Sequence, residues 1–125
     1  MAKILAVDDQ LVMRKMVAVA LESAGHQVTA LEDGIQAYRF ATSNEVDIVI
    51  SDINMPYIQG TTLIRRLRTL PAYEDIPMLM LTTESSDEMK RLARENGADG
   101  WIQKPFDAEK LVHAVDKILT KFDIH

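Results

Sequence analysis

The chain has 125 residues, with 14 Lys and Arg against 19 Asp and Glu, a formal net charge of -5 and no cysteine. The acidic balance argues against nonspecific nucleic-acid binding, which depends on cationic side chains that meet phosphates. The missing cysteines exclude disulfides and thiolate metal sites. Because no apolar stretch reaches the roughly 18 residues of a membrane span, we expect a cytoplasmic protein with no membrane insertion, built as one domain over residues 1–125.

Short apolar runs alternate with amphipathic segments five times along the chain. The runs lie at residues 4–7, 28–31, 48–50, 78–81 and 101–102. Helices are predicted after each run, at residues 13–24, 35–41, 63–70, 87–96 and 108–122, from apolar spacings of three and four residues. This alternation is typical of an α/β fold in which helices cover both faces of a doubly wound parallel sheet.

Glycines predict where several helices begin and end. Gly25 and Gly97 follow helical segments and are expected to end them. Gly60 is expected to adopt positive φ before a helix that Thr61 or Thr62 caps.

Other residues carry signals for a helix start. Ser85 with Glu88 matches a capping box, in which two side chains satisfy backbone amides of the first turn. Asp107 is expected to cap the last helix. Asp9 could likewise be only a cap of the first helix, where an acidic side chain favours the positive end of the helix dipole.

Polar side chains follow four of the five apolar runs. In a parallel sheet of this kind, the carboxyl ends of the strands form one crevice where ligands bind. The residues that this rule places in the crevice are Asp8, Asp9, Asp52, Thr82, Thr83, Lys104 and Pro105. We therefore expect a functional site there.

The charged members of this set are Asp8, Asp9, Asp52 and Lys104, so three negative charges meet one positive charge and leave a net charge of -2. Two unit charges about 4 Å apart interact by ~4 kcal/mol near a protein surface, so converging carboxylates need relief. A divalent cation brings the sum to zero, and ligands that are all oxygens favour Mg²⁺, or Mn²⁺, over zinc. Magnesium beside a carboxylate nucleophile indicates phosphoryl transfer through an aspartyl phosphate.

The same residues resemble the motifs of a known family, the receiver domains of two-component response regulators. The matching motifs are Asp8 with Asp9, the segment DINMPYIQG at residues 52–60, Thr82, and the run of Lys104, Pro105 and Phe106. The resemblance extends over essentially the whole chain and favours single-domain receivers of the CheY type. It implies a flavodoxin-like (βα)5 fold with a five-stranded parallel sheet in the order 2-1-3-4-5.

The resemblance also implies a role for each charged residue. Asp52 would accept the phosphoryl group, and Asp9, Asp52 and the backbone carbonyl of Asn54 would hold Mg²⁺. Asp8 would act mostly through a metal-bound water. Lys104 would pair with Asp52 and then with the phosphoryl group.

The remaining motif residues are implied to transmit and limit the signal. Thr82 would turn its hydroxyl toward a phosphoryl oxygen, and Trp101 would follow it inward as the switch aromatic. Asn54 and Glu84 would tune dephosphorylation, because their side chains can admit or orient the attacking water. Pro105 would follow a cis peptide bond.

A signalling switch, and not an enzyme that acts on an external substrate, is the function that the resemblance implies. A sensor histidine kinase would donate the phosphoryl group, and the protein would catalyse only its own phosphorylation and autodephosphorylation. Output would come from contact of a monomer with a target, such as a flagellar motor switch protein in chemotaxis. A phosphorelay intermediate is the alternative within the family.

Two other classes of protein share parts of this pattern. A phosphatase of the haloacid dehalogenase type also uses an aspartyl phosphate and Mg²⁺, but it would need a second Asp where this chain has Asn54. A flavodoxin-like cofactor carrier would need a phosphate-binding loop of Ser, Thr and Gly where this chain has Asp8 and Asp9.

Several other residues are given structural roles only. The solvated surface is expected to hold the basic runs Arg65, Arg66, Arg68 and Lys90, Arg91, Arg94, together with His26, His113 and His125. The methionines Met55, Met78 and Met80 are expected to fill the core and a loop.

Overall fold

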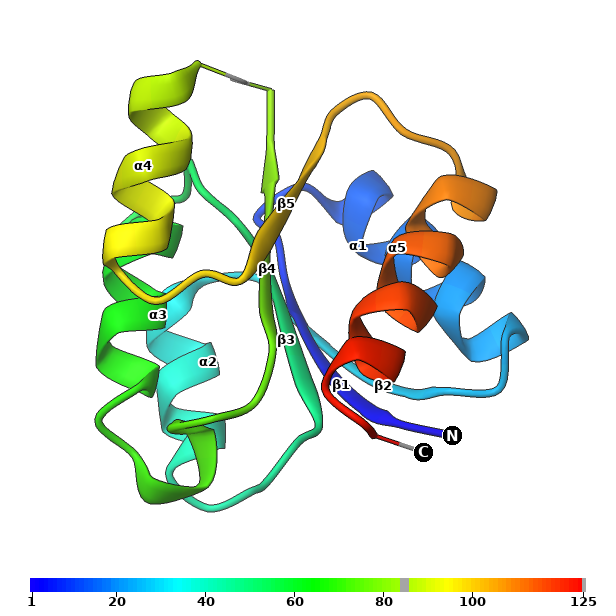
Figure 1. Ribbon diagram of the computed structural model, residues 1–125, viewed down its shortest axis with the longest axis horizontal. Helices are drawn as coiled ribbons and strands as arrows, with labels where there is room; N and C mark the ends of the chain where they lie inside the picture. Colours follow the sequence, from blue (N-terminus) through cyan, green and yellow to red (C-terminus); the bar gives the residue numbers. More distant parts are fainter. Residues whose placement is uncertain (84–85, 125) are drawn as a thin grey trace.

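The protein forms one parallel five-stranded sheet with the strand order β2-β1-β3-β4-β5, as the sequence and its resemblance predict. The structure is a computed structural model that describes residues 1–83 and 86–124. Figure 1 shows α1 and α5 on one face of the sheet and α2, α3 and α4 on the other. The doubly wound arrangement is therefore confirmed.

The strands and helices alternate along the chain. The strands are β1 (Lys3–Val7), β2 (Gln27–Leu31), β3 (Ile48–Asp52), β4 (Met78–Thr82) and β5 (Gly100–Gln103). The helices are α1 (Leu11–Ser23), α2 (Gly34–Ala41), α3 (Gly60–Leu67), α4 (Asp87–Glu95) and α5 (Ala108–Lys121), with a short 3-10 turn at Pro71–Tyr73 that the apolar pattern did not predict.

Side chains that alternate along the central strands supply two separate apolar cores. Leu5 and Val7 face the side of α2, α3 and α4, whereas Ile4 and Ala6 face the side of α1 and α5. This alternation is the period of two expected for a strand. Strands β3 and β4 are buried along their whole length, because both of their faces are covered by helices. Met55, Met78 and Met80 all lie in the core, as predicted.

The start of α3 differs from the prediction. Gly60 does not have positive φ but is the first residue of the helix, Gln59 is its N-cap, and Thr61 and Thr62 lie inside it. The glycine is required for a different reason, because a Cβ at this position would lie 2.0 Å from the carbonyl oxygen of Asp52. A missing side chain thus lets α3 begin against the end of β3.

The other helix boundaries agree more closely with the sequence. Gly25 and Gly97 have φ of 95° and 107°, the left-handed conformation expected after a helix. The Asp107 side chain accepts a hydrogen bond from the amide of Lys110, as predicted. At α4 the N-cap is Ser86, whose side chain accepts from the amide of Met89, so the cap lies one residue after the predicted Ser85. Ser85 itself lies outside the described residues.

Arg68 was expected on a solvated face, and this prediction is wrong. Its side chain is only 20% exposed. The guanidinium donates to the carbonyl oxygens of Tyr73, Glu74, Ile76 and Gly97 and to the carboxylate of Asp99. Arg68 thereby ties α3 to the turn after Pro71–Tyr73 and to the loop between α4 and β5.

His26 was also expected on the surface, but its side chain is only 8% exposed. Its Nδ1 accepts from the amide of Ala2 at 3.1 Å, so the ring proton lies on Nε2, which donates to Asp116 at 3.3 Å. His113 is exposed as predicted, and His125 lies outside the described residues. Among the helices of the described residues, none is long and apolar enough to span a membrane.

Candidate functional site

The strand register brings the predicted site residues to one edge of the sheet. Val7 of β1 is paired with Ser51 of β3, so the next residues, Asp8 and Asp52, come to neighbouring positions. On the other side, Asp52 is paired with Leu81, which places Thr82 one residue beyond it. The register therefore brings these residues to the same edge of the sheet, as predicted.

Three carboxylates converge at this edge of the sheet. One oxygen from each of Asp8, Asp9 and Asp52 lies within 4.8 Å of the others. Asp8 and Asp52 are only 2% and 7% exposed, whereas Asp9 is open to solvent. We call these three residues the acidic pocket, and its exposed member leaves a route by which an ion or a small ligand can enter.

Lys104 supplies the positive charge that was predicted for the pocket. Its Nζ lies 3.1 Å from Oδ2 of Asp8 and 3.3 Å from Oδ1 of Asp52. The side chain of Lys104 is only 10% exposed, so the two contacts are shielded from water and are stronger than surface ion pairs. The peptide bond between Lys104 and Pro105 is cis, as the resemblance implies.

Asp8 is held in place by contacts that the sequence reasoning did not find. Its Oδ1 accepts from the amide of Gln10 at 2.9 Å, and Nη1 of Arg14 donates to its backbone carbonyl at 2.9 Å. In the sequence, the only hint of the Arg14 contact is that a basic residue follows the acidic pair by one to two helical turns. The alternative that Asp9 caps α1 is wrong, because the N-cap of this helix is Gln10.

Burial raises the pKa of Asp52 above its usual range. The nearby Lys104 ammonium opposes this rise, and the negative charge of Asp8 adds to it. The amide of Ile53 also donates to Oδ1 of Asp52 at 2.9 Å, which favours the ionised form. The carboxylate of Asp52 is thus poorly hydrated and held by fixed donors, a suitable state for a nucleophile.

Two residues that were predicted to tune dephosphorylation have different outcomes. Asn54 follows the acidic pocket and is exposed, so its side chain can be reached by solvent. Glu84 lies outside the described residues, and its predicted role is not addressed by the structure.

Thr82 and Trp101 both line one narrow hollow between the sheet and α4, which is too small to admit a water molecule. Thr82 is 3% exposed, and Trp101 is partly buried against the core on the α4 side. The hollow is lined by Ile53, Thr82, Met89, Lys90, Ala93 and Trp101. The two predicted switch residues therefore lie in the same part of the protein, beneath α4.

The acidic pocket fits a hard divalent cation. Its donors are carboxylate oxygens that already converge, and the local net charge with Lys104 is -2, from three negative charges and one positive charge. Oxygen donors and a charge of this sign are what Mg²⁺ and Mn²⁺ require. Asp8, Asp9 and Asp52 are the residues that could hold such an ion.

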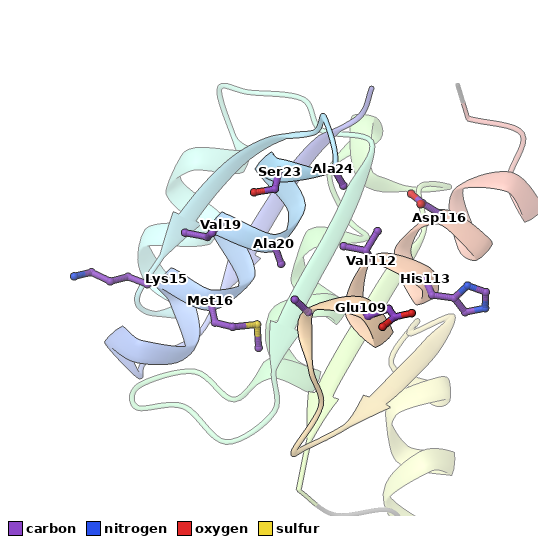
Figure 2. A pocket seen from close by; sticks show the side chains of 11 residues that line it. Lys15, Met16, Val19, Ala20, Ser23, Ala24, Glu109, Val112, His113 and Asp116 are labelled. Atoms are coloured by element: carbon purple, nitrogen blue, oxygen red, sulfur yellow. The ribbon is translucent and has the colours of Figure 1, made fainter.

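A larger hollow of about 890 Å³ lies elsewhere, between α1 and α5. Figure 2 shows that Met16 and Ala20 of α1 face Val112 of α5 across it. Its lining includes Lys15, Glu109 and Asp116 but none of the acidic-pocket residues. We assign the functional site to the acidic pocket, because the converging charges lie there.

Residues 4–116 match the response regulator receiver domain family, and the chain belongs to this family. It is 35% identical over 119 residues to the chemotaxis protein CheY homolog of Campylobacter jejuni, an alignment that covers 94% of this chain and 92% of that protein. The chain spans about half the length of other curated relatives that it matches, which are transcriptional regulators.

Solved structures agree with this placement. The chemotaxis response regulator CheY4 of Vibrio cholerae is 41% identical, with a TM-score of 0.92 over 95% of this chain and 99% of that chain. The receiver domain of the sensor histidine kinase PA1611 from Pseudomonas aeruginosa is 26% identical, with a TM-score of 0.87 over 95% of this chain and 98% of that chain. That domain was solved with a magnesium ion in its active site cleft. The fold and the sequence together define a CheY-like receiver domain of two-component signalling.

Proposed function

We propose that this receiver is a phosphorylation-driven switch that takes a phosphoryl group from a sensor histidine kinase onto Asp52. The single observation that carries the proposal is the contact of 3.3 Å between Lys104 and Asp52 inside the acidic pocket. A cation beside a poorly hydrated carboxylate matches what phosphoryl transfer needs, because the protein mainly positions the groups and neutralises charge.

The transfer is a displacement at phosphorus. One carboxylate oxygen of Asp52 attacks, the bond from phosphorus to the donor nitrogen breaks, and the electron pair leaves with the imidazole of the kinase. Lys104 moves its hydrogen bonds from the Asp52 carboxylate to an oxygen of the arriving group. Hydrolysis by water later frees inorganic phosphate and returns the carboxylate, so the protein acts on itself and not on an external substrate.

Asp8, Asp9 and Asp52, with the backbone carbonyl of Asn54, are the residues that hold Mg²⁺ in this proposal. When bound, the ion supplies positive charge against the phosphoryl oxygens. The convergence of the three carboxylate oxygens within 4.8 Å supports this ligand set. The magnesium ion in the related PA1611 receiver supports the choice of ion.

Thr82 and Trp101 carry the signal away from Asp52. The phosphoryl group adds about -1.5 to -2 charges and new acceptor oxygens, which draw the Thr82 hydroxyl toward them. Trp101 follows into the hollow that both residues border, and the surface of α4, β5 and α5 changes with it. Thr82 thus links the chemistry to a surface that a partner can read.

Chemotaxis is the pathway that the relatives favour, because the Campylobacter jejuni and Vibrio cholerae proteins are both named chemotaxis proteins. The target in this proposal is a flagellar motor switch protein, bound by contact. A phosphorelay intermediate is separated from this function by one measurement: it passes its phosphoryl group to a histidine phosphotransfer protein, whereas a chemotaxis receiver loses it to water.

The test is phosphorylation with a radiolabelled small donor, such as acetyl phosphate, in the presence of Mg²⁺. We expect label on the wild-type protein and none on Asp52→Asn. Asp75→Asn, which changes an exposed carboxylate outside the pocket, serves as the matched control and should label normally. Undiminished labelling of Asp52→Asn would falsify the assignment of the acceptor.

A further inference from the structure

Two cations of α4 lie against the ring of Trp101. The Nζ of Lys90 is 5.2 Å from the ring centroid, and the Cζ of Arg94 is 5.4 Å from it. Lys90 and Arg94 are four residues apart, so they stand one turn from each other on the same face of the helix. Both distances fall within the roughly 6 Å at which a cation is attracted to an indole face, the most favourable of the aromatic faces.

The two cations differ in where they stand relative to the hollow that leads to Thr82. Lys90 lines this hollow together with Trp101, and Arg94 is not among its lining residues in the described part of the chain. Lys90 is also only partly exposed, which corrects the expectation that its whole run is a solvated face. A ring that moves inward toward Thr82 leaves the position in which both cations lie over its face.

We propose that Lys90 and Arg94 form a clamp that holds Trp101 in its resting position and so sets the resting bias of the switch. Both are positioning residues, because they act through the indole and touch no reacting atom. The inference rests on the proposed function in one respect, the inward movement of Trp101. The clamp itself is a property of the resting protein.

A cation–π contact of ordinary strength changes an equilibrium by about two- to fivefold. Loss of either cation should shift the ratio of inward to outward ring by this factor, and loss of both should shift it about tenfold. An activating ligand then needs a lower concentration, because a larger fraction of the protein is already competent to bind it.

The experiment uses the single tryptophan of the chain as a reporter. The protein is labelled with 5-fluorotryptophan and titrated with beryllofluoride in the presence of Mg²⁺ while the fluorine resonance is recorded. The variants are Lys90→Gln, Arg94→Gln and the double variant. Each of them should move the resting resonance toward the ligand-bound position and lower the half-saturating concentration.

Arg91→Gln is the matched control. Arg91 is on the same helix, its side chain is 68% exposed, and it pairs with Glu95 at 3.6 Å. Its loss removes the same charge without touching the clamp, so the half-saturating concentration should stay constant or rise, since beryllofluoride is an anion. The conservative variants Lys90→Arg and Arg94→Lys keep a cation on the ring and should behave like the wild type. Urea unfolding of every variant checks that the fold is retained.

The clamp is overturned if Lys90→Gln and Arg94→Gln leave the resting resonance and the half-saturating concentration unchanged, or if Arg91→Gln lowers that concentration equally. A wild-type resonance that ignores beryllofluoride would instead count against the proposed movement of Trp101. In that case the clamp is supported if the resonance of the ligand-free protein moves in Lys90→Gln and Arg94→Gln but not in Arg91→Gln. The clamp is contradicted if the resonance does not move in those two variants.

Discussion

The ammonium of Lys104 lies 3.3 Å from Oδ1 of Asp52, and both side chains are only 10% exposed. The same ammonium lies 3.1 Å from Asp8. One cation therefore offsets two buried carboxylates, while Asp9 remains in solvent. This arrangement ties the stability of the protein to the charge balance of its acidic pocket.

Replacement of Lys104 by Met should destabilise the protein and strengthen the binding of Mg²⁺. Loss of one partner from a buried ion pair costs about 3 kcal/mol, because the remaining charges are left uncompensated. The pocket becomes more negative by one charge, which attracts the ion. Urea unfolding and titration calorimetry measure the two effects. Lys110→Met removes an exposed lysine and should change the free energy of unfolding by less than about 0.5 kcal/mol.

Asp52→Asn should stabilise the metal-free protein at neutral pH. Because burial raises the pKa of Asp52 above its ordinary value of 3.8, the folded protein keeps this proton at pH values where the unfolded chain has released it. The contribution of Asp52 to stability therefore falls as the pH rises from 3.8 through the raised pKa. Asparagine does not ionise and avoids this loss. Urea unfolding across pH should show the advantage shrinking as the pH falls toward 3.8, and a constant advantage would contradict the explanation.

Arg68→Ala should lower the free energy of unfolding by about 3 kcal/mol, because three half-buried and two exposed acceptors lose a charged donor. Arg68→Lys keeps the charge but not the several N–H donors of the guanidinium, so it should recover only a minor part of the lost free energy of unfolding. Arg65→Ala and Arg66→Ala change exposed residues of the same helix and are the controls. Equal effects at all three positions would show that helix propensity, and not the hydrogen bonds, explains the loss.

Tyr57→Gly should stabilise the protein by about 1 kcal/mol. Tyr57 has φ of 69°, and the amide of Ile58 donates to the carbonyl of Pro56 across it at 2.8 Å, which is a γ-turn. A left-handed backbone costs roughly 1–2 kcal/mol for a residue with a Cβ, and glycine avoids this cost. The Tyr57 ring is 81% exposed, so little packing is lost. Thermal unfolding of Tyr57→Gly and Tyr57→Ala separates the relief of backbone strain from the loss of ring packing, since both variants lose the ring but alanine keeps the strain.

The sequence was sufficient for the parts of the site that follow from strand order. Asp8, Asp52 and Lys104 follow apolar runs within two residues, and in a parallel sheet the register alone brings such residues together. The pairing of Val7 with Ser51 shows this directly. The single-domain organisation over residues 1–125 stays a prediction.

Features that depend on contacts between distant side chains could not be predicted in this way. Arg68 looks in the sequence like any basic residue of an amphipathic helix, and only the fold brings five acceptors around its guanidinium. The sequence around His26 likewise gives no sign of its buried position, because its partner Asp116 lies on α5, far away in the chain. Gly60 was predicted to have positive φ, whereas it is needed for a close approach to the backbone of Asp52. Such an approach leaves no pattern in the neighbouring sequence.

The two apolar cores described above lie on opposite faces of the same sheet, and the backbone of the sheet separates them. Trp101, Arg68 and α4 belong to one compartment, and His26 with α5 belongs to the second. Changes made in opposite compartments should add in free energy, whereas changes made within one should couple. Substitutions in the core beneath α1 should therefore leave the opposite core unchanged, whereas substitutions in α5 can still reach Trp101, because α5 and Trp101 line a common hollow at the edge of the sheet.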